Sequence, residues 1–330
     1  MRIIHLCRVS LYARPTFRAR GGCAVRHIFI INPNSGPQDA TASIRRQIAA
    51  ANAENFTDIH LTQAPGDATR YVSKLCSETT EELRFYACGG DGTLNEVVNG
   101  AAGHPHAAVG CWPCGSGNDF VKYYGGKQAF LDLPAQLSAA VTPIDLIRVN
   151  DRYAVNVVNI GFEAKAAARM VSFRRIPLFQ GARSYYPAVV TTLIDGLKNP
   201  FRISLDGEKM FDGNILLCTF ANGSYVGGSF HCAPRADMAD GLMEICMVTP
   251  ISRLRFAKLI GFYQRGEHLD NPAMKDCVTY RRARKAEIES DRESMICLDG
   301  EILKGTHFTV QSIPGALRLI LPAGAAHTEG

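Results

Sequence analysis

The sequence contains 330 residues, of which 46% are hydrophobic and 20% are charged, and its formal net charge is +5. This length favours two domains, and the absence of any run near 18 uninterrupted apolar residues excludes a predicted membrane-spanning helix. The charge is too small to indicate nucleic-acid binding, although it suits an anionic membrane surface or a phosphorylated ligand.

Residues 1–25 differ in composition from the rest of the chain. They carry five arginines and no acid, and their apolar residues do not form one face. A secretory signal would need a longer apolar core and a small-residue cleavage site. We expect a disordered basic extension, with a membrane-surface arm or an organellar targeting segment as the alternative.

The first half of the chain alternates strand and helix patterns. Apolar runs predict strands at 27–31, 58–62, 85–88 and 108–112, and apolar residues at helical spacing lie between them. This alternation predicts a parallel α/β sheet with right-handed crossovers. Ligands of such sheets bind beyond the carboxyl ends of the strands. Four segments are expected to meet there, namely residues 32–36, Thr62, residues 89–93 and residues 113–119.

The sequence Gly-Gly-Asp-Gly-Thr at residues 89–93 is the centre of this arrangement, between a strand and a helical stripe that begins at Leu94. Glycines let the backbone approach a ligand closely, and the free N–H groups at a helix start attract phosphate. The better-known phosphate loops have a lysine, whereas this turn has Asp91, so a bound phosphate would require Mg²⁺ or a network of charges. The alternative is a tight Asp-Gly turn without a ligand.

Cys111 and Cys114 form a Cys-x-x-Cys sequence after the fourth strand. Thioredoxin-like chemistry requires such a pair at a helix N-terminus, whereas this pair spans a strand end and a glycine loop. A zinc site there would need two more ligands at matching spacing. The eleven cysteines follow no spacing framework, which predicts reduced thiols in a cytoplasmic protein.

From residue 144 onward the pattern changes to short strands of period two. Two pairs of such segments, 145–149 with 153–160 and 201–205 with 209–221, flank the turns at 150–151 and 206–207, as in β-hairpins. Further strands are predicted at 241–248, 285–290, 295–298 and 307–312. The second half is therefore predicted to be antiparallel β, with the linker near residues 141–144.

Two helical segments, 164–197 and 252–266, interrupt these strands. In both, basic residues alternate with aromatic and aliphatic residues. This combination suits the headgroup region of an anionic membrane. It is equally typical of helices that pack on a sheet and leave a basic rim in solvent.

In this order and spacing, the motifs resemble the catalytic domain of the diacylglycerol kinase and sphingosine kinase-like lipid kinases, particularly the soluble bacterial members. The resemblance covers residues 26–322. Its motifs are Asn32 to Gly36, Gly89 to Thr93, Asn95-Glu96, Asn99-Gly100, Gly115 to Phe120, Asn222-Gly223, Gly227-Gly228, Ala233-Pro234, Asp240 to Leu242 and Asp299 to Glu301. Each motif is weak alone, but the ordered set is specific.

The resemblance implies an α/β ATP-binding domain at residues 26–142, to which residues 313–330 return, and a β-sandwich lipid domain at 143–312. ATP and lipid would meet in the cleft between the domains. The implied activity is an ATP- and Mg²⁺-dependent transfer of phosphate to a lipid hydroxyl, most directly that of diacylglycerol. Sphingosine and ceramide stay open as acceptors. One alternative enzyme is an NAD kinase-like protein, since those also use a Gly-Gly-Asp-Gly turn. The non-catalytic alternative is a nucleotide-binding membrane sensor that has lost turnover.

By the same resemblance, Glu301 is the general base, and Asp91 and Asp119 are essential acids. The predicted ATP contacts are Asn32, Ser35, Gly36, Thr62, Gly89, Gly90, Gly92, Thr93, Glu96 and Asn118. A structural Mg²⁺ is expected at Asp240, with Asp237 as the second candidate acid. Without the resemblance, the turn at 299–301 would be interpreted as a hairpin with a solvated acid.

The expected partners follow from this activity. They are a lipid substrate at the membrane surface and anionic phospholipid. No nucleic-acid partner is expected, and a homodimer is possible. The expected location is cytoplasmic, with peripheral association at the inner membrane face.

Overall fold

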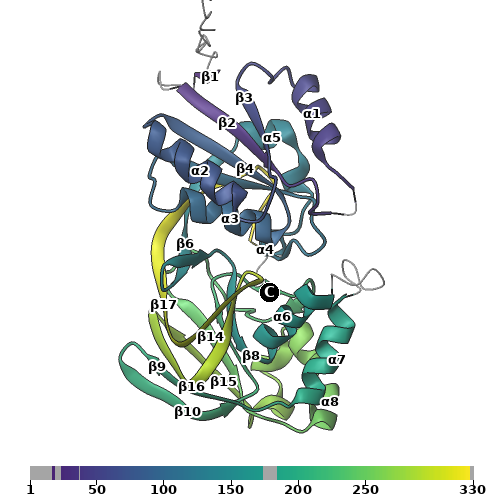
Figure 1. Cartoon of the computed structure of the whole chain (residues 1–330), viewed down its shortest axis with the longest axis vertical. Coiled ribbons are helices and arrows are strands. Elements are labelled where there is room, and N and C mark those ends of the chain that lie inside the picture. The colour runs from purple at the N-terminus through teal and green to yellow at the C-terminus, as the bar shows by residue number, and fades with distance from the viewer. Residues whose placement is uncertain (1–16, 19–23, 37, 174–183, 328–330) are drawn as a thin grey trace, which may run out of the picture.

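The computed structural model describes residues 17–18, 24–36, 38–173 and 184–327, and two domains are stacked along its long axis (Figure 1). The strands of the first domain are mainly parallel, whereas those of the second are antiparallel. The predicted fold class, an α/β domain followed by an antiparallel β domain, is confirmed.

The parallel sheet of the first domain has the order β3-β2-β4-β5-β17. Its first strands are β2 (Ala24–Ile31), β3 (Thr57–Leu61), β4 (Glu82–Gly89) and β5 (Ala107–Pro113). The helices are α1 (Thr41–Ala50), α2 (Asp67–Glu78), α3 (Asp91–Ala101), α4 (Asp119–Lys122) and α5 (Leu133–Leu137). Ile28 and Ile30 pack with residues of α2 and α3, and Phe29 and Ile31 pack with residues of α1. Strand β2 is thus buried on both faces, which explains its continuous apolar run.

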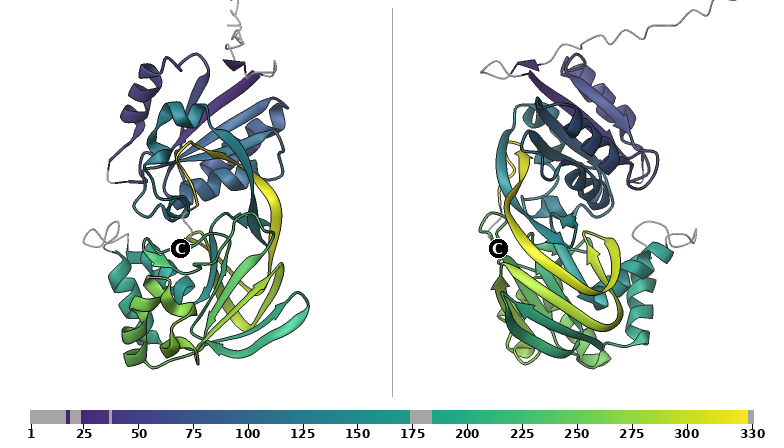
Figure 2. Two further views of the ribbon diagram at one scale, coloured as in Figure 1. Left: turned by 180° about the vertical axis from the view of Figure 1, so that it is seen from behind. Right: turned by 60° about the vertical axis from the view of Figure 1, so that its left-hand side comes forward.

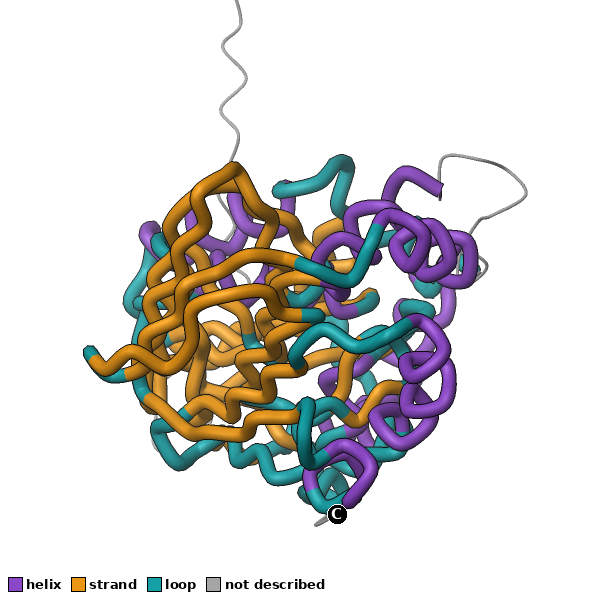
Figure 3. Tube along the Cα trace, turned by 90° about the horizontal axis from the view of Figure 1, so that it is seen from below, coloured by secondary structure: helices purple, strands orange, loops and turns teal. Residues whose placement is uncertain are grey.

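The second domain continues the sheet in the order β17-β16-β8-β11-β14-β15, with β9 paired to β16 and β10 paired to β9. Its strands are β6 (Ala140–Val149), β7 (Arg152–Ala154), β8 (Val157–Gly161), β9 (Asn199–Leu205), β10 (Glu208–Ile215), β11 (Leu217–Ala221), β12 (Tyr225–Val226), β13 (Phe230–His231), β14 (Met243–Val248), β15 (Val278–Ala283), β16 (Lys285–Leu298) and β17 (Glu301–Leu321). Helices α6 (Phe162–Phe173), α7 (Tyr185–Asp195) and α8 (Arg253–Gln264) gather on one side of the strands (Figure 3). Phe256 and Leu259 of α8 share an apolar core with Leu217 and Val248 of the sheet.

Two long strands connect the domains. Strands β6 and β17 pair antiparallel, with an irregularity between Ile313 and Leu317, and they run side by side from one domain to the other (Figure 2). The expected linker at residues 141–144 therefore lies inside a strand. The end of β17 pairs in parallel with β5 through Arg318 and Leu319, so the chain returns to the first domain.

The predicted strands differ from the observed ones in three places. The strand expected at 153–160 is interrupted at residues 155–156, because their N–H groups bind a carboxylate instead of a neighbouring strand. The strand expected at 209–221 divides at Leu216, since β10 pairs with β9 whereas β11 pairs with β8 and β14. Residues 285–298 form one strand with a register shift where two strands were expected.

Part of the N-terminal extension forms a short strand. Strand β1 (Phe17–Arg18) pairs antiparallel with Ala24 and Val25 at the start of β2. The rest of the extension lies outside the described residues, as do residues 174–183 of the predicted basic helix. None of the helices in the described ranges has the length and apolar character needed to cross a bilayer.

Candidate active site

Three loops meet at the carboxyl ends of β2, β4 and β5 through backbone contacts that leave no room for side chains. A Cβ added to Gly115 would lie 2.3 Å from the Cα of Gly90. A Cβ added to Gly36 would lie 2.2 Å from the carbonyl oxygen of Cys114. Helix α3 begins at Asp91, next to this junction, so the free N–H groups of its first turn are available to an anion such as phosphate.

Replacing Gly115 by Ala is expected to lower the free energy of unfolding by about 1–3 kcal/mol, since the new methyl group would force the two glycine loops apart. Thermal unfolding and ATP binding should both be measured. The control is Gly261→Ala in helix α8, where the added Cβ meets only the flexible end of Arg265 at 3.4 Å and helix propensity favours alanine. Equal stability of the two variants would contradict the close packing described here.

Asp91 and Asp119 lie beside Gly117. A Cβ added to Gly117 would be 2.9 Å from Oδ2 of Asp91 and 3.9 Å from Oδ2 of Asp119. Oδ1 of Asp91 accepts the backbone N–H of Phe120 at 3.2 Å. Burial, and then the charge of Asp119, raise the pKa of Asp91 to about 7. Two neighbouring carboxylates with restricted access to water form a site suited to a cation.

Asp119 also connects the two domains. Its two carboxylate oxygens accept the N–H of Gly228 at 3.0 and 2.9 Å, and Oδ1 accepts a hydrogen bond from Nζ of Lys122 at 2.6 Å. Nζ of Lys122 also donates to the carbonyl oxygen of Gly228. Sequence reasoning missed Lys122, although its position three residues after an acid that opens a helical turn was an available signal.

Glu301 follows the two-residue turn Asp299-Gly300 between β16 and β17. The φ angles of these two residues are 48° and 100°, as in a type I′ hairpin turn. Oε1 of Glu301 lies 3.9 Å from the position that a Cβ on Gly92 would occupy. The structure therefore brings the exposed carboxylate predicted as the base, from the second domain, to the first turn of α3 in the first domain.

Asp299 holds this turn against both domains, a function that sequence reasoning did not assign to it. Its carboxylate accepts the N–H groups of Val155, Asn156 and Val157 at 2.7, 3.1 and 2.9 Å. It also accepts a hydrogen bond from Nδ2 of Asn95 on α3 at 3.0 Å. The conformation of the Glu301 turn thus depends on a contact with the helix that begins at Asp91.

Replacing Asp299 by Ala is expected to lower the free energy of unfolding by about 3 kcal/mol, because three buried N–H groups would lose their acceptor. Thermal or denaturant unfolding would measure the loss. Asp206→Ala is a matched control, since Asp206 also opens an Asp-Gly turn with φ of 49° and also accepts backbone N–H groups, but is exposed. A loss no larger than that of the control would contradict this interpretation.

The remaining predicted ATP contacts lie at the same sheet edge and bind one another. Nδ2 of Asn32 donates to Oγ1 of Thr93 at 3.3 Å, and Oγ of Ser35 donates to the carbonyl oxygen of Asn32 at 3.0 Å. Asn118, with φ of 52°, accepts the N–H of Gly115 and donates to its carbonyl oxygen. These bonds fix the shape of the loops before any ligand binds.

Thr62 and Glu96 are engaged differently. The N–H of Thr62 continues the pairing of β3 with β2 through the carbonyl oxygen of Ile31. The Glu96 carboxylate accepts the N–H groups of Gly66 and Ala68 at 2.8 and 3.2 Å, at the start of α2. Both oxygens of this carboxylate are therefore engaged in holding the loop, and a direct contact between Glu96 and ATP stays a prediction.

The acids predicted to hold a structural Mg²⁺ have other partners. The Asp240 carboxylate forms an ion pair with Arg282, and its Oδ1 accepts the N–H of Leu242 at 2.9 Å. Oδ1 of Asp237 accepts the N–H of Ala239 at 2.9 Å. In the part of the chain that the structure describes, Asp237 and Asp240 belong to no compact group of three metal-binding side chains. A guanidinium already pairs with Asp240, and the metal site at these two acids stays a prediction.

Comparisons with known proteins match both domains. Residues 26–149 match the model of the diacylglycerol kinase catalytic domain, and residues 156–321 match that of the YegS C-terminal NAD kinase beta sandwich-like domain. The diacylglycerol kinase of Staphylococcus carnosus is 29% identical over 282 residues, with 82% of this chain and 87% of the relative covered. That of Bacillus subtilis is 27% identical over 278 residues, with 82% and 88% covered. A crystal structure of a Bacillus anthracis diacylglycerol kinase aligns with a TM-score of 0.66 and 21% identity, covering 91% and 98%.

Proposed function

The chain belongs to the diacylglycerol kinase and sphingosine kinase-like lipid kinase family, and we propose that it transfers the γ-phosphoryl group of ATP to the hydroxyl group of diacylglycerol. The family makes it a phosphotransferase with an alcohol acceptor. The lipid and the metal are the parts that we add by proposal.

One contact carries the proposal, the approach of Glu301 to the first turn of α3. Phosphoryl transfer requires alignment of donor and acceptor more than covalent help from the protein. The N–H groups of Gly92 and Thr93 would hold phosphate oxygens, while the Glu301 carboxylate accepts the proton that the lipid hydroxyl loses as the new bond forms. Both groups are close enough to act on one transfer.

The residues around Gly117 fit a bound Mg²⁺. Oxygen ligands are those that Mg²⁺ prefers, and burial followed by the neighbouring charge of Asp119 raises the pKa of Asp91, so a bound cation would offset both effects. We propose that Asp91 holds the ion, with Asp119 nearby. When bound, Mg²⁺ would supply neutralisation of the terminal phosphates of ATP.

Labelled ATP offered with diacylglycerol, sphingosine, ceramide and NAD in parallel mixed micelles tests the proposal. We expect labelled phosphatidic acid as the main product. Labelled sphingosine or ceramide would show that the acceptor is that lipid instead of diacylglycerol, with the lipid kinase reaction unchanged. Labelled NADP without labelled lipid would overturn the lipid kinase assignment, and no transfer to any of the four acceptors would favour the nucleotide-binding sensor without turnover.

We also propose that the protein binds anionic membranes peripherally from the cytoplasm, through α7 and α8. Ile194 of α7 and Leu254 of α8 are 66% and 69% exposed, and the two helices are joined by hydrogen bonds from Arg253 to carbonyl oxygens of α7. Exposed apolar residues beside basic ones suit a headgroup region.

The double variant Ile194→Asp/Leu254→Asp is expected to reduce binding to phosphatidylglycerol-containing vesicles at least tenfold in co-sedimentation. Its activity in detergent micelles should stay near that of the unchanged protein. Glu293→Asp, on an exposed part of β16, is the control. Unaltered vesicle binding by the double variant would place the membrane contact elsewhere.

A further inference from the structure

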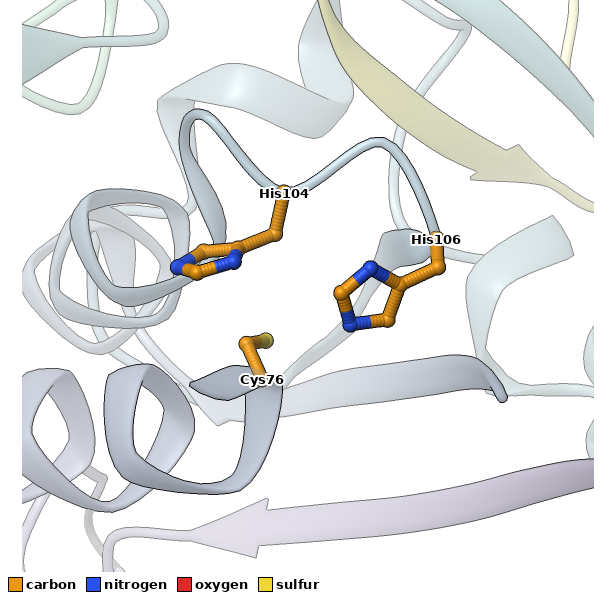
Figure 4. A group of neighbouring side chains, drawn as sticks. All are labelled: Cys76, His104 and His106. Atoms are coloured by element: carbon orange, nitrogen blue, oxygen red, sulfur yellow. The ribbon is translucent and has the colours of Figure 1, made fainter. Parts of the chain in front are cut away.

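A thiol and two imidazoles meet in the first domain, at the sheet edge opposite the glycine loops. Cys76 lies in the last turn of α2, and His104 and His106 lie in the loop between α3 and β5. The Sγ atom and one ring nitrogen from each histidine all lie within 4.8 Å of one another. Figure 4 shows the two rings and the thiol around one common space.

Backbone hydrogen bonds hold the loop that carries the two histidines. The N–H of His104 donates to Ala101 at the end of α3, and its carbonyl oxygen accepts the N–H of Ala107 at 3.0 Å. The carbonyl oxygen of His106 accepts the N–H of Leu83, which joins the loop to β4. Both histidines are therefore held by a tight turn rather than by a long loop.

One ring nitrogen in the group has no partner among the described residues. Nε2 of His106 is buried and makes no hydrogen bond with that part of the chain. A buried polar nitrogen without a partner is unfavourable, and such an atom calls for a specific explanation. A metal ion bound to the nitrogen would supply the missing interaction.

We propose that Cys76, His104 and His106 bind Zn²⁺. One thiolate and two imidazoles are ligands that zinc prefers, whereas Mg²⁺ prefers oxygen. Binding would replace the proton on Sγ of Cys76 by the metal, and that proton would pass to solvent. Three protein ligands leave a fourth position, which water could occupy to complete a tetrahedral site. Cys76 and His106 line a surface hollow of about 500 Å³ together with residues 77–81, so water can reach the group.

The site would tie together elements whose other ends form the candidate active site. Helix α2 follows the loop that Glu96 holds, α3 begins at Asp91, and β5 leads to the loop that contains Gly117. Zinc would join the far ends of α2 and α3 at the entrance to β5. We therefore expect zinc to raise the melting temperature of the whole protein without being required for phosphoryl transfer.

The test uses the full chain, stripped of metal with a chelator and titrated with Zn²⁺ against a chromophoric competitor, and separately with Co²⁺. We expect one ion per chain and a sulfur-to-cobalt charge-transfer band. The triple variant Cys76→Ala/His104→Ala/His106→Ala should bind at least tenfold more weakly and lack the band. The control is His5→Ala/Cys7→Ala/Cys23→Ala, which removes one histidine and two cysteines outside the described ranges and should keep both signals.

A single Cys76→Ser variant guards against a folding defect in the triple variant, since it changes one atom in a buried position. It should fold as the unchanged protein does, by circular dichroism without metal, and should lose the sulfur band. Zinc binding of unchanged stoichiometry and affinity in the triple variant would overturn the proposal. So would a cobalt spectrum without a sulfur band in the unchanged protein.

Discussion

Replacing Glu301 by Gln is expected to lower kcat by about a hundredfold or more while leaving ATP affinity nearly unchanged. Glutamine keeps the size of the side chain but cannot take the proton from an alcohol. Glu301 is exposed and follows a turn that Asp299 holds, so the substitution should leave folding intact. Steady-state assays with diacylglycerol micelles would give kcat, and a fluorescent ATP analogue would report nucleotide binding.

Glu293→Gln is the matched control for this experiment. Glu293 is an exposed glutamate on β16, the strand before Glu301, and it lies at the register shift. Its replacement by glutamine should leave kcat unchanged. Full turnover by Glu301→Gln would move the base elsewhere, with Asp91 as the next candidate. A large loss of ATP affinity with kcat retained would instead assign Glu301 to nucleotide binding.

The sequence was sufficient to predict the alternation of strands and helices in the first domain, because buried parallel strands are continuous apolar runs. Residues 28–31 of β2, for example, are fully buried on both faces. It also predicted that the loops at 32–36, 89–93 and 113–119 lie together, since the carboxyl ends of parallel strands share one edge. Contacts between Gly36 and Cys114, and between Gly90 and Gly115, show this convergence.

Contacts between distant segments could not be predicted in the same way. Asp299 and Asn95 are 204 positions apart, and the carboxylate interrupts the predicted strand at residues 155–156 by taking their N–H groups. The partners of Glu96 and Asp240 are likewise tertiary, and they change what these acids can bind. A motif identifies a residue type at a position, whereas the partners of its side chain come from the fold.

The two domains are coupled at the site by more than the strands that connect them. Asp119 in the first domain binds Gly228 in the second, and Asp299 in the second binds Asn95 in the first. Both contacts lie next to residues proposed to act on phosphate or lipid. A change in the angle between the domains would therefore alter the approach of Glu301 to Gly92, so these two contacts maintain the geometry that transfer requires.

Replacing Asp91 by Asn is expected to abolish most activity, by about a hundredfold or more, and yet to raise the melting temperature at pH 8. Asparagine can still accept the N–H of Phe120 but carries no charge to hold Mg²⁺. The folded-state pKa of Asp91, about 7, lies above its ordinary value of 3.8, so the folded protein retains the proton between these values. The contribution of the Asp91 carboxyl group to the free energy of unfolding is therefore fully present below about pH 4 and is lost as the pH rises towards 7.

Unfolding at pH 4 and pH 8, with and without Mg²⁺, separates the two effects of Asp91→Asn. The variant should gain stability over the unchanged protein at pH 8, where Asp91 is ionised beside Asp119, and gain little at pH 4. Mg²⁺ should stabilise the unchanged protein at pH 8 more than the variant, because it offsets the same repulsion. Asp151→Asn, in the exposed β6–β7 turn, should show neither difference. Lower stability of Asp91→Asn at pH 8 would mean that Asp91 serves the fold, since a carboxylate kept for binding a cation should destabilise the folded protein when the cation is absent.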